Sequence, residues 1–177
     1  MELDPAIVDL LERLGPIPAL VYDMHWDVVG ANAMGRAFLA YPVARDPQRD
    51  NILWRMFLDD AKRASYVDWP TEAQRCVAQF RRSYGRAPED GRFDDLVGEL
   101  RAGSPDFARW WSDMDVADRA RDPGHVTYRR HPDVGDYGAR QVTLTAAGDD
   151  SLRINVPVPM IEDGSAEKLR SYFARLG

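Results

Sequence analysis

The spacing of apolar residues changes period twice along this chain, and that change limits the folds open to it. Residues 17–23 and 26–32 are short apolar runs typical of strands, and residues 124–160 alternate apolar and polar side chains with the two-residue period of strands. Apolar residues in 33–118 instead recur three and four positions apart, as in helices. Strands at both ends of a chain can pair in one sheet, and the helices between them then cover its face. We therefore expect an α+β fold with one sheet of about five strands and a large helical insertion over one face.

Two of the expected strands, residues 17–23 and 26–32, form a hairpin, and the other three lie within 124–160. Residues 131–135 and 147–150 are expected to form the turns between these three. Pro157 and Pro159 cannot donate a ladder hydrogen bond, which favours an edge position or a fraying end for the last strand.

The clearest helix start is Ser104-Pro105-Asp106, which combines a capping serine, a first-turn proline and an acid near the positive end of the helix dipole. No repeat or long linker divides the chain, so we expect one domain. Its expected parts are an N-terminal helix (1–16), two strands (17–32), a helical block (33–118), three strands (124–160) and a C-terminal helix (164–176).

Composition excludes several classes of protein. The net charge of −6 and pI near 5.1 argue against binding of nucleic acid by this chain alone, because phosphate neutralisation needs a basic face. Cys76 is the single cysteine, so no disulfide framework is possible, and it is expected to be packed rather than reactive. The acidic start is unlike a signal peptide, and no apolar run is long enough for a membrane span, which indicates a cytoplasmic protein without membrane contact. Of the 23 basic residues 21 are arginine, a bias typical of GC-rich, actinobacterial-type coding.

Residues 4–160 contain a series of short motifs in a fixed order. They are Pro18-Ala19-Leu20-Val21, residues 26–32, Asn51-Ile52-Leu53, Asp68-Trp69, Tyr84-Gly85-Arg86, residues 96–100, Ser104-Pro105-Asp106-Phe107 with Trp110, and residues 130–135. In this order and spacing, the chain resembles the C-terminal ligand-binding domain of the MmyB-like transcription regulators, bacterial proteins with an N-terminal helix-turn-helix. The resemblance implies a PAS-like antiparallel sheet and the binding of a fatty-acid-like or other lipophilic effector. It also implies DNA contact only through a helix-turn-helix domain, which residues 1–177 do not contain.

Six aromatic side chains of the helical block could line a pocket for an alkyl chain or a ring. They are Trp54, Phe57, Phe80, Phe107, Trp110 and Trp111, and Met114 follows at the same helical spacing. Apolar residues at helical spacing chiefly report burial, so an ordinary core is the alternative for each of them. As a group they match the apolar lining of small-ligand sites.

Five strand residues complete the candidate ligand-binding set: Tyr128, Arg130, Arg140, Val142 and Leu144. Strand alternation puts Arg130 in phase with Tyr128, and Arg140 in phase with Val142 and Leu144. An isolated charge on a buried apolar face is costly. The two arginines are therefore either paired at the sheet margin or anchors for a ligand carboxylate, which suits the guanidinium fork.

No catalytic site, metal site or cofactor is expected. His25, His125 and His131 do not have metal-ligand spacing, no serine lies in a nucleophile elbow, and no glycine loop is suited to cradling phosphate. We expect an effector-binding sensor domain that also forms a homodimer. The alternatives are a dimerisation or interaction module with a filled core, and a stand-alone biosynthetic enzyme on the same fold.

Overall fold

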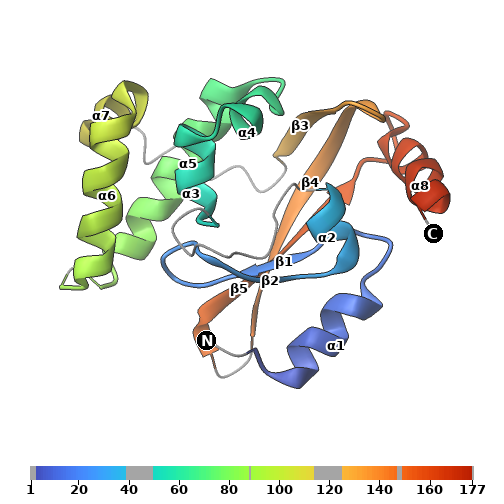
Figure 1. The fold of residues 1–177 in the computed structure, drawn as a ribbon, viewed down its shortest axis with the longest axis horizontal. Coiled ribbons are helices and arrows are strands. Elements are labelled where there is room, and N and C mark those ends of the chain that lie inside the picture. Colours follow the sequence, from blue (N-terminus) through green and yellow to red (C-terminus); the bar gives the residue numbers. More distant parts are fainter. Residues whose placement is uncertain (1–2, 39–49, 88, 114–124, 147–148, 177) are drawn as a thin grey trace.

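The computed structural model describes residues 3–38, 50–87, 89–113, 125–146 and 149–176 (Figure 1). The strands are β1 (Leu20–Tyr22), β2 (Val28–Ala31), β3 (Val126–His131), β4 (Gly135–Ala146) and β5 (Asp149–Pro159). The helices are α1 (Pro5–Arg13), α2 (Ala33–Phe38), α3 (Ile52–Leu58), α4 (Asp60–Ala64), α5 (Trp69–Tyr84), α6 (Gly91–Gly103), α7 (Pro105–Ser112) and α8 (Ser165–Leu176). None of the helices in these residues is long and apolar enough to cross a membrane.

All neighbouring strands pair antiparallel, in the spatial order β2-β1-β5-β4-β3. The first hairpin and the last three strands therefore meet where β1 pairs with β5. The expected α+β, PAS-like fold is confirmed. The expected edge position of the proline-containing strand is wrong, because β5 is central. Both prolines lie beyond Asn155, the last residue of β5 that pairs with β1, so one side of the strand is unpaired there.

Capping side chains mark where the helices of the insertion begin. Asn51, Asp68, Asp90 and Ser104 each accept a hydrogen bond from a backbone N–H in the first turn of α3, α5, α6 and α7 respectively. Such caps satisfy donors that have no partner within the helix. The predicted cap at Ser104 is confirmed.

The two faces of the sheet are covered differently. Helix α1 packs its Leu11 with Val21 and Ile154 on one face. The opposite face carries α8, whose Leu169 and Phe173 pack against β4, and it also faces the helical insertion. Figure 1 shows α3–α7 gathered to one side of the sheet, with α6 and α7 farthest from it.

Asn32 joins the sheet to the helices beside it. Its side-chain oxygen accepts hydrogen bonds from Ala19 N (3.1 Å) and Gly35 N (2.7 Å), and its amide donates to Leu11 O (3.1 Å) and Ile17 O (2.9 Å). The side chain is fully buried, so it depends on these partners for all of its hydrogen bonding.

The helices α3–α7 form a block with its own aromatic core and meet the sheet at two backbone bridges. One bridge joins Asp27, next to β2, with Asn51, and the other joins Tyr66 with Arg129 of β3. The block is therefore held near both edges of the sheet. Between these two attachments α5 runs across the face of the sheet, separated from it by a cavity.

Candidate functional site

A cavity of about 480 Å³ lies between the sheet and α5, and we call it the sheet–α5 cavity. Strand residues form one wall: Leu20, Tyr22, Thr127, Arg129, Tyr137, Ala139, Gln141, Thr143, Asn155 and Pro157. Helix α5 supplies Glu72, Arg75, Cys76, Gln79 and Arg82, and Trp26, Ile52, Met56, Tyr66 and His125 complete the lining. Its volume falls within the ~300–1,000 Å³ typical of small-ligand sites.

The amphipathicity of α5 explains why this cavity has a polar wall. The apolar stripe of the helix, which includes Ala73, Val77 and Phe80, packs into the aromatic core of the helical block. The stripe containing Arg75 and Gln79 therefore faces the sheet. The helix turns its polar side toward the sheet, so the space between them is not filled by side chains of a dry core.

Glu72 connects α5 to β3 at one edge of the cavity. Its carboxylate accepts a hydrogen bond from Thr127 Oγ1 (3.1 Å) and lies 2.5 Å from His125 Nε2. All three residues line the cavity, and Glu72 is 9% exposed. Because a buried carboxylate needs hydrogen-bonding partners, this contact holds α5 in place beside β3.

Arg129 belongs to the second attachment of the helical block. Its Nη2 donates to Ser65 Oγ (2.9 Å), and its guanidinium carbon lies 4.2 Å from the centre of the Tyr66 ring. The neighbouring Arg130 N donates to Ser65 O (2.8 Å). This part of the cavity wall is therefore held by side-chain and backbone contacts together.

Cys76 lies in the cavity wall. Burial raises the pKa of its thiol to about 12, so the thiol stays protonated at neutral pH. Since the thiolate is the nucleophile, the expectation of an unreactive cysteine agrees with this environment.

The five predicted strand residues lie on the face of the sheet opposite the cavity. Tyr128, Arg130, Arg140, Val142 and Leu144 are all exposed there. They do not line the sheet–α5 cavity, whereas the residues one position away, Thr127, Arg129, Gln141 and Thr143, do. Strand alternation sends neighbouring side chains to opposite faces, so an error of one residue in phase inverts the whole assignment.

The predicted aromatic residues lie in the helical block and do not line the cavity. Phe57, Phe80, Phe107 and Trp110 are buried in its aromatic core, and Trp111 packs against that core. Trp54 is half-buried, and its Nε1 donates to Glu99 (2.7 Å). Met114 is outside the described residues. The buried rings are therefore part of the hydrophobic core of the helical block.

None of the predicted site residues that the structure describes lines the cavity, because the search followed apolar periodicity in the helices and strands. The available signal was the run of polar residues on one stripe of α5 together with the polar positions of β4, Gln141 and Thr143. On their own, both patterns look like solvent-exposed faces.

A second cavity of about 830 Å³ adjoins the first. It shares Tyr22, Trp26, Gln79, Arg82 and Thr143 with the sheet–α5 cavity and adds Asp23, Met24, Ser83, Arg86, Thr145, Ser151 and Arg153. The two cavities therefore adjoin each other along α5.

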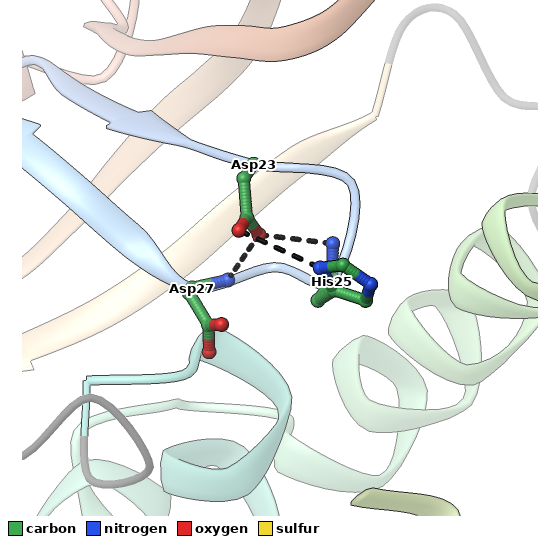
Figure 2. Close-up of side chains that lie close together, drawn as sticks. All are labelled: Asp23, His25 and Asp27. Atoms are coloured by element: carbon green, nitrogen blue, oxygen red, sulfur yellow. Dashed lines mark hydrogen bonds and ion pairs between the residues drawn. The ribbon is translucent and has the colours of Figure 1, made fainter. Parts of the chain in front are cut away.

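Asp23, His25 and Asp27 lie together in the turn between β1 and β2, with possible metal-ligating atoms within 4.8 Å of one another (Figure 2). Asp23 accepts hydrogen bonds from the backbone N–H groups of His25 (2.9 Å) and Asp27 (3.0 Å), and burial raises the pKa of its carboxyl. Sequence spacing did not suggest this grouping.

Neighbouring side chains engage the same groups. His25 Nε2 lies 2.7 Å from Asp90, whose pKa is lowered by that hydrogen bond, and Asp27 pairs with Arg92 and accepts from Asn51. A guanidinium already neutralises Asp27. These contacts explain the grouping as a turn joined to the start of α6.

Comparison with known proteins identifies the family of this chain. No curated protein was found to be similar to this chain. A family comparison matches residues 3–171 to the MmyB-like transcription regulator ligand binding domain, and this match includes every residue of both cavities. With nearly all of its residues matched, the chain belongs to the MmyB-like transcription regulator ligand binding domain family.

Proposed function

We propose that this chain senses a small-molecule effector in the sheet–α5 cavity and passes the signal to a DNA-binding domain of the regulator. The observation that carries the proposal is a cavity of ligand size between the sheet and a helix that presents a polar stripe to it. The family supports a regulatory role rather than catalysis.

The lining favours an amphipathic effector. Leu20, Ile52, Met56, Ala139 and Pro157 offer apolar surface to a hydrocarbon chain or a ring. Arginine, glutamine and threonine side chains on α5 and β4 supply hydrogen-bond donors for a polar end. A fatty-acid-like molecule fits this division, because small-ligand sites combine apolar walls with a few placed polar groups.

The two attachments suggest how binding is transmitted. A ligand between α5 and the sheet contacts both the helix and the strands. The bridges at Asn51 and Tyr66 hold the helical block near the edges of the sheet. Occupancy therefore favours one spacing of α5 from the sheet. A ligand can shift such an equilibrium only by its difference in affinity for the two states.

Native mass spectrometry of the purified chain, followed by denaturing extraction, tests the proposal. We expect a bound lipophilic mass in the unaltered chain and its loss in Thr143→Trp, which fills the region shared by both cavities. Val142→Trp is the matched control, since Val142 is adjacent to Thr143 in β4 and its side chain points away from the cavity. Equal occupancy in both variants would place the ligand elsewhere and refute the proposal.

A second candidate function, self-association through the outer face of the sheet, has an observation of its own. Four large apolar side chains are exposed on that face beside Arg130 and Arg140: Tyr128, Val142, Leu144 and Val158. Exposed apolar patches commonly mark interaction sites. The proposed occupant is a second copy of this chain, which would bring together the same patch from both subunits of a homodimer.

Sedimentation analysis of Leu144→Glu tests this second proposal. We expect the variant to be monomeric at concentrations where the unaltered chain is dimeric. Ile161→Glu is the control, because Ile161 is 80% exposed but lies outside the sheet. A monomeric unaltered chain would contradict the proposal.

A further inference from the structure

The second cavity differs in chemistry from the first. The arginines in its lining come from both walls: Arg82 and Arg86 on the α5 side, and Arg153 on β5. Arg82 and Arg86 are four residues apart, and Arg86 follows the end of α5 directly after Gly85. Hydroxyl and amide groups lie beside the arginines, on Ser83, Thr143, Thr145, Ser151 and Gln79. This lining is rich in hydrogen-bond donors.

Among the described residues of that lining Asp23 is the only acid, and its carboxylate is engaged by the backbone N–H groups of the β1–β2 turn. Within the described part of the chain, neither Arg82 nor Arg86 takes part in an ion pair with an acid. The chain as a whole has 29 acidic and 23 basic residues. The described residues of this lining, three arginines and one acid, therefore form a positive region in an acidic protein.

Charges of one sign within a cleft add to the local potential, which raises the concentration of the opposite ion. A single carboxylate has one negative charge, and one guanidinium fork can engage both of its oxygens. Three guanidinium groups on facing walls, together with hydroxyl donors, suit a group with more charge and more acceptor oxygens. A phosphate monoester has both properties.

We infer that the second cavity binds the phosphate head group of a phosphorylated amphipathic effector whose apolar body occupies the sheet–α5 cavity. This inference rests on the proposed function, since it requires that the first cavity is a ligand site. Along β4 the lining of the two cavities extends from Tyr137 to Thr145, which are eight residue steps or about 26 Å apart. The two adjoining cavities are together long enough for an extended molecule with its head in one and its body in the other.

Isothermal titration calorimetry with a matched series tests the inference. The probes are dodecyl phosphate, dodecanoate and dodecanol, each below its micelle concentration, and inorganic phosphate alone. We expect dodecyl phosphate to bind at least about tenfold more tightly than dodecanol, and dodecanoate to lie between them. The advantage of the phosphate should shrink as salt is raised, because partly exposed charges are screened.

Arg82→Gln and Arg86→Gln should each weaken dodecyl phosphate binding by about tenfold. Arg86→Gln should leave dodecanol binding unchanged, because Arg86 lines the second cavity but not the sheet–α5 cavity. Both side chains are exposed, so the variants should fold, and thermal unfolding without ligand checks this. Arg140→Gln is the matched control. It removes an exposed arginine from the opposite face of the sheet and should change neither affinity.

The outcomes separate this inference from the function on which it rests. Equal affinity for the three dodecyl probes, with no effect of Arg82→Gln or Arg86→Gln, would overturn the phosphate site and leave the proposed effector cavity standing. Inorganic phosphate that binds as tightly as dodecyl phosphate would overturn the link between the two cavities. Binding of none of the probes, together with no mass carried through purification, would overturn both proposals.

Discussion

Phe107→Leu tests whether the aromatic rings of the helical block are core or ligand contacts. Phe107 has no exposed surface, lies 5.1 Å from Phe57 in an edge arrangement and stacks on Trp111 at 5.5 Å between ring centres. Leucine keeps most of the apolar volume but loses both ring pairs, each worth about 0.5–1.5 kcal/mol. We therefore expect a loss of about 2 kcal/mol, which in a chain of this length lowers Tm by about 4–8 °C.

Differential scanning calorimetry measures the loss, and effector binding well below Tm measures the affinity of the folded variant. We expect Tm to fall and affinity to stay unchanged, because Phe107 does not line either cavity. Tyr128→Leu is the control, since Tyr128 is 44% exposed, and it should shift stability by no more than about 0.5 kcal/mol. A variant at Phe107 that keeps its Tm but loses affinity would refute the reasoning.

Three further substitutions have defined outcomes. Asn32→Asp removes the amide donors to Leu11 O and Ile17 O, and thermal unfolding should show a loss of about 2 kcal/mol or more, since unsatisfied buried acceptors cost ~1–3 kcal/mol each. Gly35→Ala would place its Cβ 2.3 Å from Ala19 O, so the same assay should show destabilisation, and an unchanged Tm would contradict this close approach. Burial, assisted by nearby Arg129 and Arg55, lowers the pKa of Lys62 well below 10.5. Between the lowered pKa and 10.5 the unfolded chain binds the extra proton, so stability should rise with pH there. Lys62→Met should flatten that rise in denaturant unfolding measured across pH, and an identical slope would contradict the assignment.

The order of elements was predictable because it depends on local signals. The helix start at Ser104 needs only a capping side chain, a proline and an acid next to one another, and the structure has α7 begin there. The hairpin of residues 17–32 likewise follows from two short apolar runs with a tight turn between them. These signals act within a few residues, so they do not depend on which parts of the chain meet later.

Which face of the last strands is buried depends on the elements that pack against them, and no local sequence pattern indicates this. Val142 and Leu144 alternate with threonines, and alternation normally places apolar residues inside. In this sheet α1 covers the outer face over β1, β2 and β5, whereas side chains on the outer face of β3 and β4 are exposed. The inner face of those strands lines a cavity with polar walls, where threonine and glutamine fit better than valine. The polar inner face follows because the helical block stands off from the sheet.

The aromatic residues point to the same cause. Helices α3–α7 bury most of their rings against one another, with Phe57 and Phe107 in contact across two of these helices, and Trp26 of the β1–β2 connection joins the same core. A block with its own core does not need an apolar face toward the strands, and this leaves α5 free to present Arg75 and Gln79 there. Helical periodicity alone cannot separate this arrangement from one in which the rings face the sheet, because both bury the same stripe. The separating signal is the second, polar stripe of α5, and its substitution should therefore alter ligand binding more than stability.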